Sequence, residues 1–210
     1  MTIPIPHLRV PGGQDRRQAD ILDAVRDAFV EKGFDGASMQ DLARAAGISV
    51  GNFYRYFESK NAIVEAIVAR DLDEVGRDFA DIIRSAHPLN ALRATIRRHV
   101  EGHACCDGDG LLWADITAAA GRKPEIATIL DRMETNIGHY LTTVFGLVTK
   151  LPEAEAARRY GGHAALIVML VKASGMRIPV PGAGQTDLNN LILRTIDRTL
   201  DEIATDAAKG

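Results

Sequence analysis

The sequence predicts an all-α protein with about nine helices, and three observations support this prediction. Apolar residues recur at helical spacing along most of the 210 residues, and no segment shows the sustained apolar–polar alternation of a strand. The eight prolines fall outside the interiors of the periodic segments, where a helix tolerates them. Aromatic residues make up only 5% of the chain, which fits a helical core rich in alanine and leucine.

The first helix is expected after an N-terminal arm, residues 1–13, which contains three prolines and two glycines. Ile21, Val25 and Phe29 then share one helical face until Gly33 ends the helix. The same spacing, read between prolines, glycines and polar caps, places the later helices. The nine expected helices cover residues 15–32, 38–46, 49–55, 59–86, 89–106, 110–121, 124–149, 153–176 and 186–206.

Residues 38–60 carry the most specific pattern in the chain. Ser38 and Asp41 form a capping box at the start of one short helix, and Gly47 supplies the positive φ of a tight turn. Ser49 then caps a second short helix. Two short helices joined by such a turn form a helix-turn-helix, whose second helix enters the DNA major groove. We therefore expect this segment to bind DNA.

The same residues resemble the TetR family of bacterial transcriptional regulators. The matching residues are Ala43, Ala46–Ser49, Phe53–Phe57 and Ser59–Lys60, and the likeness covers about residues 15–68. The resemblance implies a homodimeric repressor that binds a palindromic operator in double-stranded DNA, is released by a small-molecule inducer and needs no cofactor. It also implies three parts: the flexible arm, a three-helix DNA-binding domain and a larger helical ligand-binding and dimerisation domain, over residues 1–13, 14–68 and 69–210.

The resemblance further indicates which residues contact DNA. Val50, Gly51 and Asn52 open the recognition helix, and Asn52 is the best base reader because an amide both donates and accepts on one base edge. Gly51 has no side chain, so the reading surface is sparse. Gln40 matches a position that sometimes reaches bases. The remaining DNA-binding residues are Ser49, which caps the helix, and four expected phosphate contacts, Ser38, Tyr54, Tyr56 and Lys60.

Charge and cysteine content set two further expectations. The formal charge of −3 does not favour a nucleic-acid binder, but residues 43–57 contain two arginines and no acid, so we expect weak non-specific DNA binding that depends on a few placed contacts. Adjacent Cys105 and Cys106 cannot form an unstrained bridge with each other. The longest apolar run, residues 164–171, is too short to span a bilayer. We therefore expect a bacterial cytoplasmic protein that associates with the nucleoid and has no membrane partner.

The last expected helix carries one apolar stripe, and the helix before it is apolar on more than one face. One face can pack inside the chain while the other packs against a second copy. By the resemblance, the two helices form a four-helix dimer interface, whose twofold symmetry presents two identical DNA readers to a palindrome. The expected interface residues are Ala165, Val168, Leu188, Leu191, Ile192, Ile196 and Leu200.

An inducer site needs a largely apolar cavity with a few polar groups. The candidate lining residues combine polar, aromatic and sulfur-containing side chains on the middle helices: His99, His103, Trp113, Asp115, Met133, His139 and Tyr140. Trp113 is the only tryptophan of the chain, and it suits stacking on a ligand about as well as it suits filling a core.

Two alternatives use another group of side chains. His99, His103 and Cys106 fall on one expected helical face, and imidazole and thiolate are ligands that Zn²⁺ and Cu⁺ favour, so a metal-sensing or redox-sensing regulator is the first alternative. The second is an all-α enzyme that uses the same cluster. The sequence contains no nucleophile–base motif, phosphate loop or His-Glu-x-x-His pattern, and we therefore expect no enzymatic activity.

Overall fold

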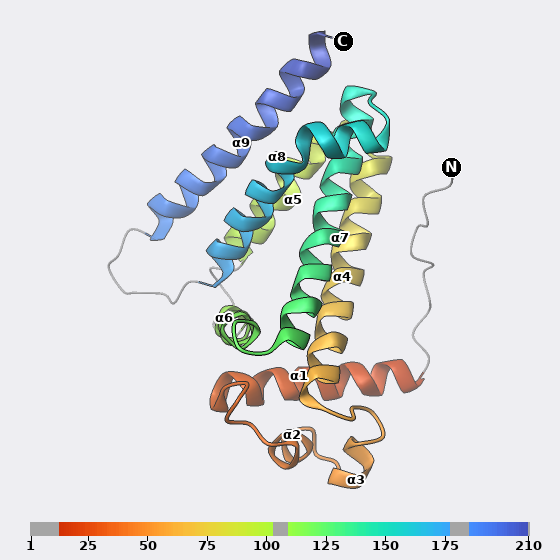
Figure 1. Cartoon of the computed structure of the whole chain (residues 1–210), viewed down its shortest axis with the longest axis vertical. Helices are drawn as coiled ribbons and strands as arrows, with labels where there is room; N and C mark the ends of the chain where they lie inside the picture. Colours follow the sequence, from red (N-terminus) through yellow and green to blue (C-terminus); the bar gives the residue numbers. More distant parts are fainter. Residues whose placement is uncertain (1–12, 103–108, 177–184, 210) are drawn as a thin grey trace. The chain divides into compact units, whose positions relative to one another are not determined.

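The structure is a computed structural model that describes residues 13–102, 109–176 and 185–209. Over these ranges the elements are nine helices with no strand, as the sequence predicts (Figure 1). Their bounds are α1 (Gly13–Lys32), α2 (Met39–Ala45), α3 (Val50–Phe53), α4 (Lys60–Arg84), α5 (Pro88–Gly102), α6 (Asp109–Ala120), α7 (Pro124–Thr149), α8 (Glu153–Gly175) and α9 (Gln185–Lys209).

The caps predicted for α2 and α3 are confirmed. The Ser38 hydroxyl accepts a hydrogen bond from the backbone N–H of Asp41 at 3.2 Å, and the Asp41 carboxylate accepts one from the backbone N–H of Ser38 at 3.0 Å. Ser49 accepts from the backbone N–H of Asn52 at 3.3 Å, and Gly47 has the expected positive φ, 65°. Each cap stabilises its helix by about 1 kcal/mol.

The third helix is shorter than predicted. It was expected to reach residue 55 but ends at Phe53, after four residues. The backbone N–H groups of Arg55 and Tyr56 bond three residues back, to the carbonyls of Asn52 at 3.1 Å and Phe53 at 2.9 Å. These tighter bonds replace the α-helical ladder, so the recognition helix is a single turn.

Contacts divide the described chain into two compact units, and the boundary lies between Asp73 and Glu74 within α4. Unit 1 contains residues 13–73 and 109–132, and unit 2 contains residues 74–102, 133–176 and 185–209. Unit 1 therefore includes α6 and the start of α7 as well as the helix-turn-helix. Compactness assigns no function, so the expected split into domains over 14–68 and 69–210 stays a prediction.

The core of unit 1 holds the helix-turn-helix against α1. The predicted inward face of α1 is buried, with Ile21, Val25 and Phe29 at most 1% exposed. This helix packs against α2 on one side and α6 on another. Leu42 of α2 and Phe53 of α3 are fully buried, so the hydrophobic effect fixes both short helices on the same core.

The core of unit 2 is formed by the second half of α4 together with α5, α7, α8 and α9. Its centre contains Phe145 and Tyr160, whose rings meet edge to face with centroids 6.1 Å apart. Arg93 of α5 also binds α9, with its guanidinium 2.8 Å from Asp197 and 2.6 Å from Asp201. In Figure 1, α8 and α9 run side by side in opposite directions. Among the described helices, none has the length and apolar character needed to cross a membrane.

Candidate nucleic-acid interface

The turn between α2 and α3 is held by buried side chains and by the backbone. Leu42, Ala43 and Phe53 are fully buried, and α2 packs on α3. The backbone N–H of Ile48 donates to the carbonyl of Ala43 at 3.1 Å. These contacts set the outward face of α3, which is the face that a helix-turn-helix presents to the major groove.

The predicted base readers lie on α2 and α3, in unit 1. Gly51 and Gln40 are exposed, while Val50 and Asn52 are half-buried. An added Cβ at Gly51 would meet nothing within 4 Å, so this glycine is not required by packing. The structure therefore leaves Asn52 as the side chain in α3 with an amide available to a base edge.

The predicted phosphate contacts differ in their surroundings. Tyr54 is 50% exposed, and Ser38 and Ser49 are exposed helix caps. Tyr56 is half-buried, and its ring centroid lies 6.5 Å from that of Phe57, so its ring also belongs to the packing of this segment.

Lys60 lies in a different environment from the other predicted contacts. Its ammonium donates hydrogen bonds to three backbone carbonyls, those of Phe34 at 2.7 Å, Ala37 at 3.1 Å and Asp35 at 3.2 Å. The prediction that Lys60 contacts phosphate is not tested by the structure, but an ammonium has only three protons. In this structure all three are used within the protein.

The loop between α1 and α2, residues 33–37, is bound by α6 and by the turn that follows α6; we call it the Phe34 loop. The Asp115 carboxylate of α6 accepts a hydrogen bond from the backbone N–H of Phe34. Asp35 pairs with Arg122 at 2.8 Å and also with Lys123. Sequence analysis missed these contacts because the partners lie 81 to 88 residues apart and no local pattern connects them.

The pairing of Asp35 predicts a pH dependence of stability. Hydrogen bonds from Lys123 and Arg122 lower the pKa of Asp35 from 3.8 to about 2. The carboxylate therefore contributes stability that is fully present above pH 3.8 and is lost as the pH falls through about 2. We expect the melting temperature of Asp35→Asn to lie below that of the wild type at pH 5, and the difference to shrink between pH 4 and pH 2.

Thermal unfolding followed by circular dichroism across this pH range measures the difference. The matched control is Asp131→Asn, an exposed aspartate outside the loop. A gap between wild type and Asp35→Asn that stays constant down to pH 2 would contradict the assignment.

Comparisons with known proteins agree with this geometry. Residues 21–67 match the family model described as bacterial regulatory proteins, tetR family. The transcriptional regulator UidR of Escherichia coli K12 is 30% identical over 121 residues, which are 58% of this chain and 60% of UidR. The transcriptional repressor KstR2 of Mycobacterium tuberculosis is 27% identical over 125 residues, which are 59% of this chain and 62% of KstR2.

Over residues 21–67 the chain is therefore similar to the tetR family of bacterial regulatory proteins. It spans about 60% of the length of the first curated relatives that it matches. Solved tetR-like structures match a larger share of this chain than the curated relatives do. Salmonella enterica GusR superposes with a TM-score of 0.69 at 20% identity, over 90% of this chain and 98% of that one.

A tetR transcription regulator from Haloarcula marismortui gives a TM-score of 0.68 at 14% identity, over 89% and 97% of the two chains. At these identities the likeness shows the fold alone.

The candidate inducer residues are divided between the two units. Asp115 accepts from the Phe34 loop, as described above. Tyr140 stacks on Phe79 with ring centroids 5.3 Å apart, and His139 lies 3.6 Å from Glu153. The described candidates are Trp113 and Asp115 in unit 1 and His99, Met133, His139 and Tyr140 in unit 2. His103 lies outside the described residues.

The predicted metal cluster falls largely on residues that the structure does not describe. His103 and Cys106 both lie outside the described ranges, together with Cys105. His99 is described, and its Nε2 lies 3.2 Å from a carboxylate oxygen of Asp78. Within the described part of the chain, no group of three potential ligands is positioned to hold a metal ion, so metal sensing stays a prediction without structural support.

The predicted dimer residues separate into buried and exposed groups. Ile192, Ile196 and Leu200 are at most 7% exposed and pack in the core of unit 2 within their own chain, and their part in a dimer interface stays a prediction. The apolar face of α9 is wide, so one side of it packs in the core of unit 2 while the other side, which includes Leu188 and Leu191, is exposed. The predicted residues that do reach the surface are Ala165, Val168, Leu188 and Leu191.

The most exposed large apolar side chain in the described parts of α8 and α9 was not among the predicted interface residues. Met169 is 60% exposed, and it lies four residues after Ala165 on α8. The i, i+4 spacing was sufficient to find it. Because α8 and α9 are antiparallel neighbours, Met169 near the end of α8 and Leu191 near the start of α9 lie at the same end of the pair.

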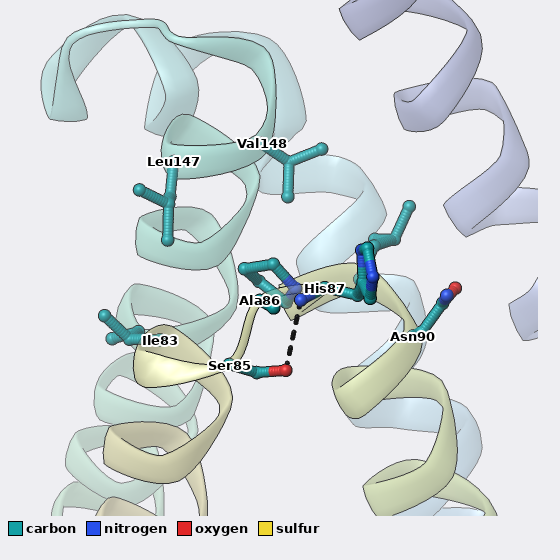
Figure 2. Close-up of a pocket in the computed structure, with 9 residues that line it drawn as sticks. Ile83, Ser85, Ala86, His87, Asn90, Leu147 and Val148 are labelled. Atoms are coloured by element: carbon teal, nitrogen blue, oxygen red, sulfur yellow. Dashed lines mark hydrogen bonds between the residues drawn. The ribbon is translucent and has the colours of Figure 1, made fainter.

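A groove of about 510 Å³ in unit 2 lies where the turn between α4 and α5 faces the second half of α7 (Figure 2). The backbone N–H of His87 donates to the Ser85 hydroxyl at 3.2 Å within this turn. None of the predicted inducer residues lines it. Its lining consists of Ile83, Ser85, Ala86, His87, Pro88, Leu89, Asn90, Leu147 and Val148.

Proposed function

We propose that this protein is a DNA-binding transcriptional regulator that acts through the helix-turn-helix of unit 1. The single observation that supports this most strongly is the first turn of α3. Ser49 caps this turn, buried Phe53 anchors it, and its N-terminal residues Val50, Gly51 and Asn52 remain in reach of solvent. An N-terminal turn presented in this way is the part of a recognition helix that contacts base edges.

The DNA contacts that we propose follow from this placement. Asn52 reads a base edge, adenine most readily, and Gln40 assists from α2. Tyr54, Tyr56, Ser38 and Ser49 contact the phosphate backbone and fix the register of the helix. The local charge supports a modest electrostatic contribution, because Arg44 and Arg55 are exposed while the acids of α1 lie on another element.

We further propose that the regulator is a homodimeric repressor, released from a palindromic operator by a small molecule. The exposed apolar residues of α8 and α9 support a dimer, since two identical patches satisfy each other by twofold symmetry. KstR2, to which the chain is similar, is a transcriptional repressor, and this supports repression as the direction of control. Such a protein works in the cytoplasm, where the operator DNA is located.

Selection from a random DNA library tests the proposed function. We expect the wild-type protein to enrich sequences that contain an inverted repeat, whose half-site centres lie about 34–36 Å apart or a multiple of that. Failure to enrich any sequence would contradict the proposal.

The variant Asn52→Ala is expected to relax the base preference at one position of each half-site, at a cost of about 1–3 kcal/mol against the preferred base. Competition binding with single-base variants of the selected DNA measures this preference. Asn136→Ala, which removes an exposed asparagine from α7, is the matched control and should leave every preference unchanged. A preference that survives in Asn52→Ala would rule out Asn52 as the reader.

A further inference from the structure

We propose that Lys60 is a positioning residue, whose ammonium holds the Phe34 loop and through it the start of α2, and that it does not neutralise a DNA phosphate. This inference rests on the proposed function for its effect on DNA binding, but its structural part does not. It assigns Lys60 a role different from the phosphate contact that the family resemblance implies.

The hydrogen bonds of Lys60 within the protein use all three protons of its ammonium. Nζ of Lys60 lies 2.7 Å, 3.1 Å and 3.2 Å from the carbonyl oxygens of Phe34, Ala37 and Asp35, and it donates to all three. A phosphate contact would require at least one of these bonds to break. The freed carbonyl would then lose a charge-assisted donor.

The location of these carbonyls explains why a donor is needed. Phe34 and Ala37 are each 1% exposed, so the loop that carries them is packed against the core of unit 1. Buried backbone carbonyls need partners. The carbonyls of Phe34, Asp35 and Ala37 lie in the loop between α1 and α2, outside the hydrogen-bond pattern of either helix. Lys60, at the first position of α4, supplies donors from a neighbouring element.

The loop connects directly to the DNA-reading segment. Ala37 precedes Ser38, the N-cap of α2, so the bond from Lys60 to the Ala37 carbonyl lies one residue from the capping box. Gly36 has no room for a side chain, because an added Cβ would lie 2.3 Å from the Lys32 carbonyl. Because the loop has so little free space and Ala37 is bonded directly to Ser38, a displacement of Ala37 would also displace the start of α2.

The electrostatic surroundings also distinguish Lys60 from a free surface cation. Its Nζ lies 5.0 Å from the centroid of the Phe34 ring, and Nζ of Lys123 lies 4.6 Å from the same centroid. Burial lowers the pKa of Lys60, and the charge of Lys123 lowers it further, whereas Asp35 and Asp115 act in the opposite direction. The ring and the carbonyls surround the ammonium of this half-buried lysine.

Two substitutions separate the two roles. Lys60→Met keeps the length of the side chain and removes the ammonium, whereas Lys60→Arg keeps the positive charge. A guanidinium binds phosphate well, but its planar fork cannot direct three N–H groups from one nitrogen toward three converging carbonyls. Arginine should therefore rescue a phosphate contact and fail to rescue the Phe34 loop.

We expect Lys60→Met to lower the melting temperature by roughly 5 °C or more and to weaken binding of the selected DNA roughly tenfold. The slope of log K against log salt concentration should remain that of the wild type, because no phosphate contact is lost. Lys60→Arg should restore neither the melting temperature nor the affinity. The comparison variant Arg55→Met removes an exposed cation that lies between Tyr54 and Tyr56, two proposed phosphate contacts. If Arg55 neutralises one phosphate there, its loss should reduce the slope by about 0.9 with little change in melting.

A salt slope that falls by about 0.9 in Lys60→Met overturns the inference, whatever happens to the melting temperature, and so does full rescue by Lys60→Arg. Wild-type protein that selects no DNA sequence would instead refute the proposed function. In that case the melting temperatures of the two Lys60 variants still decide whether the ammonium holds the loop: equal stability of Lys60→Met and wild type would refute it.

Discussion

Replacing Phe53 by alanine is expected to abolish DNA binding by unfolding the helix-turn-helix. Phe53 is fully buried, and its ring centroid lies 5.6 Å from that of Phe57. Truncation of a buried phenylalanine costs about 3–5 kcal/mol through lost transfer energy and the cavity left behind. Such a loss is a large part of the roughly 5–15 kcal/mol that stabilises a typical domain. Because α3 is a single turn, it has no other buried side chain to hold it.

Chemical denaturation and binding of the selected DNA measure the two effects. Tyr54→Ala is the matched control, since it removes the next aromatic side chain, which is 50% exposed. Its free energy of unfolding should change by less than about 0.5 kcal/mol, while its DNA affinity falls through the lost phosphate contact. Phe53→Ala protein that unfolds at the wild-type denaturant concentration would show that α3 does not depend on this anchor.

Replacing Leu191 by aspartate is expected to convert the protein from a dimer to a monomer. Leu191 is 52% exposed on one chain, so the folded monomer tolerates the change. In a dimer built on α8 and α9, each substitution would bury an unpaired carboxylate, which costs about 3–5 kcal/mol. Twofold symmetry applies this cost twice. Affinity between the subunits should fall at least about a hundredfold, and operator affinity should fall with it.

Light scattering during size-exclusion chromatography tests this expectation, with a mass of 22.7 kDa for the monomer. Leu147→Asp provides the control, because Leu147 is also in unit 2 and is 49% exposed. The expected result is a monomer for Leu191→Asp and a dimer for Leu147→Asp. A dimer for both variants would place the interface elsewhere, and a monomeric wild type would refute the proposed dimer.

Local signals predicted the helices and caps well. Ser38 with Asp41, Ser49, and the positive φ of Gly47 each act within a few residues of the chain, and all are confirmed. Helix α7 begins and ends where the sequence predicted, at residues 124 and 149. These features depend on backbone groups that must find partners nearby, so the sequence alone is sufficient to locate them.

Features that depend on distant partners could not be predicted in the same way. The bond from Asp115 to the backbone of Phe34 joins residues 81 positions apart. Lys60 was interpreted as a phosphate contact because it matches such a position in the family resemblance, and only the folded chain shows the three carbonyls around it. The burial of Ile196 within its own chain could not be predicted for a related reason: a helical stripe indicates apolar residues, but not whether they face their own chain or a second copy.

The single turn of α3 has a consequence for how the proposed regulator finds its target in a genome. Only Val50, Gly51 and Asn52 of α3 precede the buried Phe53, and Gly51 has no side chain. Each protomer therefore recognises only a few base pairs. A DNA sequence of only a few base pairs recurs by chance at many places in any chromosome. The specificity for an operator then depends chiefly on the distance between its two half-sites, which the dimer fixes by holding two α3 helices a set distance apart.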